Sequence, residues 1–429
     1  MKKLIFGIGI ILLILLGLTY WSVASKPKNL GTRYVSEIAD MEKVNFRHHD
    51  SLVMAANTLY EGSDIKELMQ GEQYRDAWAM PIKVPIVFLD TLFGGMKIIE
   101  EGGGKQTHSL KLRSANGIIY TLRSIVKDPE PLIPDVAKTL GLENIVIDGI
   151  SAQHPYAATV VAALAEQAEI LSTHPKIVFV PKQPILDEFN DKYGNRMFLL
   201  EYETKGKSTW IGYNNLVEII DTDDLQELKR DNPSNVSIDQ EALVKARLFD
   251  LLIGDWDRHA KQWGWAIQKN GNSYKAIPLP CDRDNAFFNL EGIIPTIIAN
   301  KKFHPKVQSF NKEVEFLSGL VGPFDVYFLK NVPESVFIAQ AENLQKRLDN
   351  DVINMAFQEW PRQIYELDGD EIITKIISRR ENLIEYSRQF KKILNERQLL
   401  SEPLVGSEDL NLNEEQLKCF DCMASNSEY

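Results

Sequence analysis

The chain has 429 residues, of which 44% are hydrophobic and 25% charged, and its formal net charge is −12. This length suits two or three domains, or one two-lobed domain with extensions, and the composition is that of a globular protein rather than a disordered one. The negative charge argues against a nucleic-acid partner, which would require a basic surface to neutralise phosphates, although it is compatible with a local basic pocket.

The first segment, residues 1–25, contains an uncharged apolar run from Leu4 to Trp21. A run of this length crosses a bilayer as one helix, so the segment is an export signal or a membrane anchor. The small residues of SVAS, just before Lys26, would suit a signal peptidase. Because the run is longer than the apolar core of an ordinary signal peptide, we expect an uncleaved single-pass anchor.

The orientation of this anchor is open, because basic residues flank the apolar run on both sides. Lys2 and Lys3 precede it, and Lys26, Lys28 and Arg33 follow it. N-terminal anchors with such short tails more often send the body of the protein outward. We therefore expect the body on the outer, periplasmic or extracellular, side of the membrane.

Two segments follow the anchor. Residues 26–85 form a predicted helical lead-in, because apolar residues recur at helical spacing in IADMEKVNF and SLVMAANTLY. Residues 86–209 change to short β-rich runs: IVFLDTLF, MKIIEEGGGKQTHSLKLR, GIIYTLRSI, KIVFVP and RMFLLEYE. Within them, the alanine-rich run from Pro155 to Leu171 predicts one buried helix with proline in its first turn.

The rest of the chain is predicted to be mainly helical over residues 210–400, including KARLFDLLIGDW and the amphipathic EIITKIISRRENLIEYSRQFKKIL. Residues 401–429 are acidic and aperiodic, which predicts a flexible tail. Cys419 and Cys422 form a lone CxxC there, and with Cys281 the three cysteines are too few for a disulfide framework. Without a second CxxC or clustered histidines, a pair of tail thiols is favoured over a zinc site.

The most informative stretch is LFDLLIGDWDRHAKQWGWA, an apolar helical run that ends in Asp255, Asp257, Arg258 and His259. Asp282, in IPLPCDRDNAFF, follows Asp257 by twenty-five residues. Between them, WGWAIQ and YKAIPL predict a hairpin turned at KNGNS, which would bring the two loops side by side. Two carboxylates so placed suit magnesium phosphate chemistry, in which one positions an attacking hydroxyl and the other holds metal on nucleotide phosphates.

GDWDRHAKQW followed by CDRDNAFF resembles the catalytic and metal-binding loops of the atypical protein-kinase-like superfamily. That group includes type II phosphatidylinositol kinases, HipA-type toxin kinases, CotH-type spore-coat kinases and secretory-pathway kinases. More closely, the chain resembles uncharacterised bacterial kinase-like domains sometimes found downstream of a metallophosphoesterase domain. Over roughly residues 93–394, the resemblance implies an α+β, two-lobed protein-kinase-like fold. Its small antiparallel β N-lobe, residues 86–209, would carry one main helix, and residues 210–400 would form a larger helical C-lobe.

The resemblance also implies roles for individual residues, with ATP and Mg²⁺ as cofactors. Asp257 matches the catalytic aspartate and Asp282 the metal-binding one, while Gln262 stands where the family has asparagine, at the same five-residue step from the catalytic aspartate. The predicted catalytic residues are Asp257, Arg258 and His259, and the predicted metal ligands are Gln262, Asp282 and Asp284.

The stretch EEGGGKQTHSLKL resembles the nucleotide loop, which would place over the phosphates Gly102, Gly103, Gly104 and Lys105. Arg123 stands where the phosphate-gripping lysine is expected, and Lys127 competes with it for that role. Glu166, on the alanine-rich helix, is the candidate ion-pair partner of Arg123, although Glu169 lies close to it on the same helix. Arginine for lysine and glutamine for asparagine depart from the family pattern, which indicates altered chemistry or binding without catalysis.

Several of these residues also have plain structural interpretations. Asp255 could cap a helix, and His259 could orient the loop through a hydrogen bond instead of transferring protons. Asp284 could pair with Arg283, and the triple glycine could be an ordinary hairpin turn. The tryptophans are expected to pack the loop against the helical lobe: Trp256, Trp263 and Trp265.

The function expected from the resemblance is Mg-dependent phosphotransfer from ATP to a hydroxyl acceptor, which could be a protein, lipid, sugar or small molecule. The alternative is a membrane-tethered pseudokinase or binding module, which an outward-facing body favours because ATP is scarce outside a bacterial membrane. A metal-dependent phosphodiester hydrolase would need a histidine-rich metal cluster. The histidines are instead scattered over the chain: His48, His49, His108, His154, His174, His259 and His304.

Overall fold

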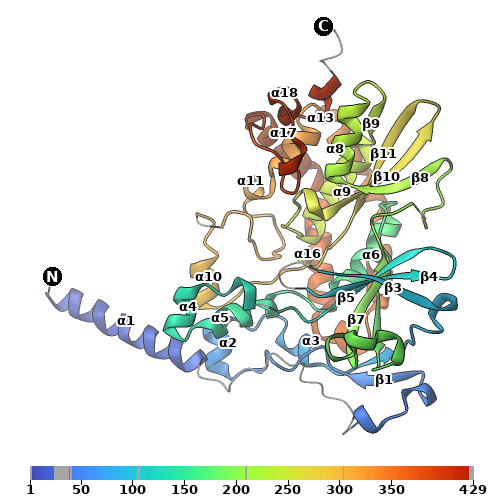
Figure 1. Cartoon of the computed structure of the whole chain (residues 1–429). Coiled ribbons are helices and arrows are strands. Elements are labelled where there is room, and N and C mark those ends of the chain that lie inside the picture. Colours follow the sequence, from blue (N-terminus) through green and yellow to red (C-terminus); the bar gives the residue numbers. More distant parts are fainter. Residues whose placement is uncertain are drawn as a thin grey trace.

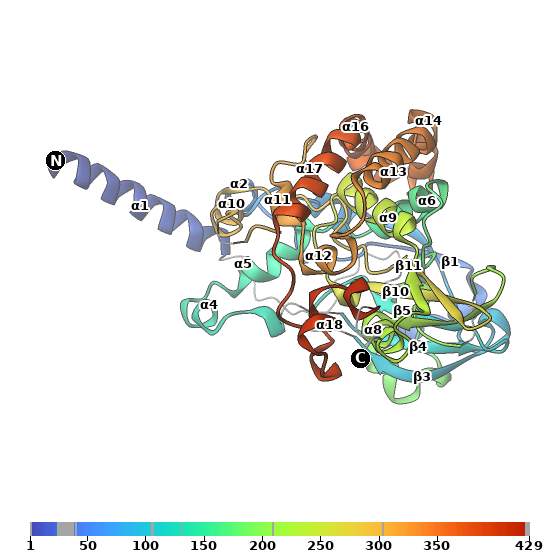
Figure 2. The same ribbon diagram turned by 90° about the horizontal axis from the view of Figure 1, so that it is seen from above.

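The computed structural model of the chain describes residues 2–23, 38, 41–103, 107–128, 130–207, 210–302 and 304–424. Helix α1 (Lys2–Val23) extends away from the rest of the chain, with its N-terminus at the far end (Figures 1 and 2). By its length and composition, this helix is able to cross a membrane. The predicted anchor segment is therefore a helix of the expected length.

The segment after the anchor contains a small sheet, which corrects the prediction of a mainly helical lead-in. Ser51–Met54 form strand β1, which pairs antiparallel with β2 (Ile82–Pro85). Two short helices, α2 (Asp64–Gln70) and α3 (Arg75–Ala79), lie between these strands. The apolar residues of SLVM fit a helix by spacing, but the segment alternates half-buried and buried side chains, as a strand does.

A five-stranded antiparallel sheet forms the centre of residues 86–209, as the β-rich runs predict. Its spatial order is β3 (Met96–Gly102), β4 (Ser109–Ser114), β5 (Ile119–Ser124), β7 (Arg196–Tyr202) and β6 (Lys176–Val180). The prediction of a strand at IVFLDTLF is wrong. This run turns at Phe88–Thr91, where the amide of Thr91 donates to the carbonyl of Phe88, and it buries Leu89 as part of a loop.

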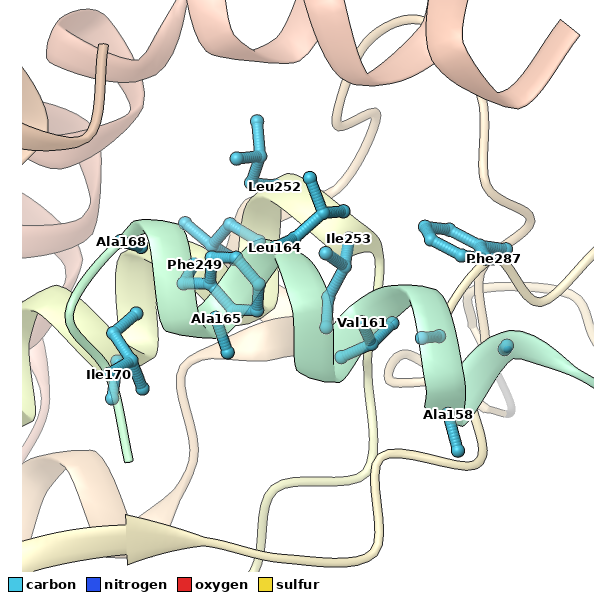
Figure 3. Packing of buried hydrophobic residues seen from close by; sticks show 14 of the residues in the cluster. Ala158, Val161, Leu164, Ala165, Ala168, Ile170, Phe249, Leu252, Ile253 and Phe287 are labelled. Atoms are coloured by element: carbon cyan, nitrogen blue, oxygen red, sulfur yellow. The ribbon is translucent and has the colours of Figure 1, made fainter. Parts of the chain in front are cut away.

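The helices of this part of the chain are α4 (Asp135–Leu140), α5 (Glu143–Asp148), α6 (Ala157–Gln167) and α7 (Asn190–Tyr193). Helix α6 is the predicted alanine-rich helix, shorter than the run from Pro155 to Leu171. Figure 3 shows its residues Val161 and Leu164 beside Phe249 and Ile253 of helix α9 (Gln240–Ile253). The alanines of α6 allow this close approach, so the sheet segment and the helical segment share one hydrophobic core.

The second large sheet has the order β8 (Leu216–Asp221), β10 (Trp263–Asn270), β11 (Ser273–Pro280) and β9 (Val236–Ile238). Helix α8 (Thr222–Asp231) follows β8. The remaining helices are α10 (Ile293–Ile298), α11 (Leu317–Leu320), α12 (Pro323–Leu329), α13 (Glu334–Arg347), α14 (Asn350–Ala356), α15 (Arg362–Ile364), α16 (Asp370–Glu381) and α17 (Leu383–Glu396). The chain is thus a mixed α/β protein with mainly antiparallel sheets.

The C-terminal segment is packed over its described residues, 401–424, which corrects the prediction of a flexible tail. It contains helix α18 (Glu414–Lys418), and Phe420 is buried against Phe328 with ring centroids 5.3 Å apart. Cys419 and Cys422 are joined in a disulfide instead of forming a pair of free thiols. Although the segment is acidic overall, a few of its apolar residues are buried, and these hold it against the rest of the chain.

Candidate functional site

Helix α9 leads into the predicted catalytic loop. The helix begins where the side chain of Asp239 accepts a hydrogen bond from the amide of Ala242, at 3.0 Å. It ends at Gly254, whose φ of +71° is the left-handed conformation that glycine adopts most readily. A Cβ atom at this position would lie 2.5 Å from the ring of Phe310. Only glycine therefore turns the chain here from the buried helix into the loop.

The two aspartates after this turn differ in their environment. Asp255 is buried, and its carboxylate accepts a hydrogen bond from the amide of Asp257 at 3.2 Å. Burial raises the pKa of Asp255 to about 7, and Asp250 adds to this while Arg258 opposes it. The side chain of Asp257 is 31% exposed. Asp255 thus shapes the loop, and Asp257 is the carboxylate that a substrate could reach.

His259 faces Asp257 through its second ring nitrogen. Its Nδ1 accepts a hydrogen bond from the amide of Lys261 at 3.2 Å, so the proton of the neutral ring belongs on Nε2. That Nε2 lies 3.9 Å from Oδ2 of Asp257. Burial lowers the pKa of His259, against the opposing effect of Asp257. The separation of 3.9 Å is longer than a hydrogen bond, so the imidazole lies beside the carboxylate of Asp257 as a donor that a small approach would engage.

Arg258, predicted as catalytic, has a buried side chain that joins the two loops of the site. Its Nη1 donates to the carbonyl of Cys281 at 2.8 Å, and its Nη2 donates to the carbonyl of Gln262 at 2.9 Å. The β10–β11 hairpin pairs Trp263 with Pro280, so it brings these carbonyls together, as the sequence predicts. The guanidinium is enclosed by these contacts and faces no substrate-accessible surface. We therefore assign Arg258 to positioning, a correction that follows from its burial.

Gln262 and Asp282 meet between the two loops. Nε2 of Gln262 donates to Oδ2 of Asp282 at 3.1 Å. Oε1 of Gln262 is buried and, among the described residues, has no hydrogen-bond partner. Asp282 has a φ of +54°, an uncommon conformation for a residue with a side chain, and its side chain is 42% exposed. An unpaired amide oxygen beside an accessible carboxylate is a pair of ligands that Mg²⁺ accepts.

Asp284, the third predicted metal ligand, lies beside two cationic side chains. Its Oδ2 lies 3.3 Å from Nη1 of Arg123 and 3.3 Å from Nζ of Lys127. Its Oδ1 is buried and has no hydrogen-bond partner in the part of the chain that the structure describes. Burial would raise the pKa of Asp284, but Arg123 and Lys127 outweigh it and lower the pKa. Lys127, which could have been a solvated turn residue, therefore belongs to the site together with Arg123.

Arg123 also forms an ion pair with Asp282, but its partner in the sheet is Glu201 and not Glu166. Nη2 of Arg123 lies 2.8 Å from Oε1 of buried Glu201, whose other oxygen accepts a hydrogen bond from Thr173 at 2.6 Å. Glu166 lies on the exposed side of α6 and pairs with His174 at 2.5 Å. The prediction for Glu166 is therefore wrong.

The reason for this correction is the face that α6 turns toward the site. A small cavity beside Arg123 and Glu201 is lined, on the α6 side, by Ala158, Val161 and Ala162. These small apolar residues leave room for the arginine but offer it no charge. The sequence contains a signal for Glu201, since it is a lone acidic residue in the otherwise apolar strand run MFLLEY. The family pattern points instead to a carboxylate on the helix, and so misses it.

The glycine-rich hairpin lies at the same level of the sheet as Arg123. In the strand register, Gly102 of β3 is opposite Ser109 of β4, which is opposite Arg123 of β5. Gly103 has a φ of +128°, and a Cβ atom there would collide with the carbonyl of Thr107. Gly104 and Lys105 lie outside the described residues. Gly102 thus lies at the end of β3, about two strand spacings, or roughly 10 Å, from Arg123.

Comparisons with known proteins were made for the whole chain. No family model matches it, and no curated protein matches it. Among solved structures, it is similar to the proinflammatory kinase CtkA of Helicobacter pylori, with 12% identity and a TM-score of 0.36 over 69% of this chain and 96% of that one. It is also similar to HipA of Shewanella oneidensis, solved with HipB and operator DNA, with 11% identity and a TM-score of 0.35 over 70% and 68% of the two chains. At TM-scores below 0.5 these are loose similarities, so the chemistry proposed below rests on the side chains of this chain.

Proposed function

We propose that the chain is a two-lobed, kinase-like enzyme that transfers a phosphoryl group from a nucleotide, ATP in the first instance, to a hydroxyl acceptor with Mg²⁺. The observation that carries the proposal is a chain of contacts: Gln262 donates to Asp282, and Arg123 contacts both Asp282 and Asp284. One oxygen of Gln262 and one of Asp284 are buried without a hydrogen-bond partner among the described residues. In folded proteins, buried polar atoms without partners are uncommon, and some of them are ligands of a bound ion.

The residues fit a magnesium ion because all three offer oxygen. Gln262 would supply its Oε1, and Asp282 and Asp284 would supply carboxylate oxygens. When bound, the ion would neutralise charge on the nucleotide phosphates and orient the transferring group. Asp282 is the most accessible of the three, so it is the ligand we expect to face the phosphates.

The acceptor hydroxyl would be positioned by Asp257. Its carboxylate is partly exposed, while the amide of the same residue is held by buried Asp255, so the side chain projects from a fixed loop. The Nε2–H group of His259 would orient it. An accessible carboxylate on a rigid loop is suited to accept the hydroxyl proton as attack proceeds.

The phosphates would be held by Arg123 and Lys127. Glu201 pairs with one side of the Arg123 guanidinium. On the other side, Nη1 of Arg123 faces Asp282 and Asp284. Incoming phosphate oxygens would share Nη1 with these carboxylates, whose charge the metal would then offset. Arginine is well suited to this role because its planar group keeps one edge on Glu201 while the other binds phosphate.

A second function, ligand binding without catalysis, is favoured by one specific observation. Arg123 is already paired with both proposed metal carboxylates, Asp282 and Asp284. A cation fixed in this place could substitute for the metal and leave a cleft that binds a nucleotide or partner without turnover. An outward-facing body would favour this function, because ATP is scarce there.

The deciding experiment is thermal unfolding of the full chain with and without Mg-ATP. A ligand at about 100 times its Kd stabilises the folded state by about 2.7 kcal/mol, which is easily measured. We expect this stabilisation to be lost in Asp282→Ala and retained in Asp231→Ala, a matched control whose side chain is 59% exposed and pairs with Arg230. Stabilisation with release of ADP supports the kinase, and stabilisation without turnover supports the binding module. Stabilisation that survives Asp282→Ala contradicts the proposed site.

A further inference from the structure

The body end of α1 is attached to the rest of the chain by specific contacts. Nε2 of Gln70 donates to the carbonyl of Ser22 at 3.1 Å and to its hydroxyl at 3.0 Å. Nδ2 of Asn144 donates to the carbonyl of Val23 at 3.0 Å. Ser22 and Val23 are buried, unlike the rest of the helix. The C-terminal end of the apolar helix is therefore held by α2 and α5, and we call this contact the seat of α1.

Large apolar side chains are exposed around this seat. They lie on three short helices, α2, α4 and α10, and we call them the collar: Leu68, Val136, Leu140, Ile297 and Ile298. Ile297 is 65% exposed and Val136 is 64% exposed. Figures 1 and 2 show α2, α4 and α10 gathered at the end of the body from which α1 emerges. Single exposed apolar residues are ordinary, but a group of them beside an apolar helix is a candidate contact surface.

The position of Tyr20 places the collar relative to a membrane. Helix α1 has 22 residues, or about 33 Å, which matches a hydrocarbon core of about 30 Å. Its body end carries Tyr20 and Trp21, residue types that concentrate where the hydrocarbon meets the headgroups. The hydroxyl of Tyr20 donates to the carbonyl of Leu140 at 3.1 Å. The collar residue Leu140 is therefore at the level of that interface.

Exposed lysines lie next to the collar, together with exposed acidic residues. The lysines are Lys138 on α4 and Lys301 and Lys302 just after α10, and the acidic residues include Asp64 on α2 and Asp135 on α4. Short helices that combine exposed apolar side chains with lysines are typical of segments that lie in the headgroup layer. Lysines there would also be attracted to anionic lipids.

We propose that the collar is inserted in the headgroup layer of the same bilayer that α1 crosses. The body then rests against the membrane in one orientation, with α1 and the collar forming a single membrane contact. This inference rests on α1 as a membrane-spanning helix and is independent of the proposed phosphotransfer. A second copy of the chain is the competing occupant of the collar.

The test uses the full chain reconstituted in vesicles of phosphatidylcholine and phosphatidylglycerol, with an environment-sensitive fluorophore on one introduced cysteine. Ile297→Cys and Val136→Cys report on the collar. Met355→Cys is the matched control, because Met355 is 62% exposed on α14 and lies outside the collar. The native Cys281 is half-buried and the other two cysteines form the disulfide, so the unsubstituted chain measures background labelling.

We expect lipids brominated on their acyl chains to reduce the fluorescence of both collar labels and to leave the Met355 label unchanged. Aqueous iodide should do the reverse. Collar labels that iodide reaches as readily as the control label would overturn the proposal. Labels shielded from iodide but insensitive to brominated lipid would overturn it in favour of a second copy. If alkaline carbonate released the chain from the vesicles, α1 would not span the membrane, and the proposal would be overturned.

Discussion

Two clusters of arginine and carboxylate groups lie close together in the molecule and differ in what they leave unpaired. In the first, which we call the buried cluster, Asp250 is fully buried between Arg247, Arg258 and Arg283. Both of its carboxylate oxygens face arginine nitrogens at 2.9 to 3.2 Å. The second, the cleft cluster, consists of Arg123, Lys127, Glu201, Asp282 and Asp284.

The charge balance separates the two clusters. In the buried cluster, three arginines face the carboxylates of Asp250 and Asp325 and the carboxyl group of Asp255, so each cation has a buried acidic partner. In the cleft cluster two cations face three carboxylates, which leaves one negative charge and, at Asp284, an oxygen without a hydrogen-bond partner in the described structure. Similar residue types thus make a scaffold in one place and, in the other, the site that we propose for a metal ion. Exposure and unpaired oxygens distinguish them, and residue type does not.

The largest expected effect is on the buried cluster. Asp250→Ala would leave three buried arginines without their common anion, which should cost about 3–5 kcal/mol of unfolding free energy. Chemical denaturation followed by circular dichroism measures this loss. Asp221→Ala is the control, because Asp221 forms an exposed ion pair with Lys205 and such pairs contribute about 0–1 kcal/mol. Equal losses in the two variants would show that Asp250 is not the centre of a scaffold.

The next largest expected effect is a loss of catalytic rate with no change in the stability of the fold. Asp257→Asn keeps the shape of the loop but removes the carboxylate that would accept a proton, so kcat should fall about 10²–10⁴-fold. Release of ADP, with water or the chain itself as acceptor, measures kcat. The melting temperature and the stabilisation by Mg-ATP should stay near those of the original chain. A variant that binds and turns over normally would remove Asp257 from the mechanism.

The sequence predicts the buried hairpin and its loops well, because β10 and β11 are adjacent in sequence and their apolar runs bracket a clear turn. It also favours Asp257 over Asp255 for the catalytic role, and the structure buries Asp255 and leaves Asp257 partly exposed. The sequence does not predict Glu201 as the partner of Arg123, because the pairing of β5 with β7 brings together residues that are far apart in the chain. It fails for the C-terminal segment, because composition hides a few specific contacts such as that of Phe420.

A moderate effect should separate Glu201 from Glu166 in the cleft cluster. Glu201→Gln removes the buried anion that holds Arg123, a hydrogen-bonded charge pair of a type that contributes about 1.5–3 kcal/mol. The apparent Kd for Mg-ATP should rise by about tenfold or more, because about 1.4 kcal/mol corresponds to a factor of ten. Glu166→Gln is the matched control and should leave the Kd unchanged, since Glu166 is exposed and pairs with His174. The opposite ranking would restore the helix residue as the partner of Arg123.

The last prediction is a change in pH dependence at Asp255, which belongs to the buried cluster. Burial raises its pKa to about 7 in the folded chain, whereas an unfolded aspartate has a pKa of about 3.9. Between about pH 4 and pH 7 the folded state therefore keeps a proton that the unfolded state loses, so the contribution of Asp255 to stability falls as the pH rises through this interval.

Asp255→Asn cannot lose a proton and can still accept the hydrogen bond from the amide of Asp257. The melting temperature of Asp255→Asn should therefore rise relative to that of the original chain as the pH rises from about 4 to about 7, by about 1 °C for each kcal/mol of difference in a chain of this length. Asp231→Asn controls for the loss of one negative charge at an exposed site. Parallel melting curves for Asp255→Asn and the original chain across this interval would mean that Asp255 is charged when folded. The buried cluster would then hold it as a third ionised carboxylate, balanced by Arg258.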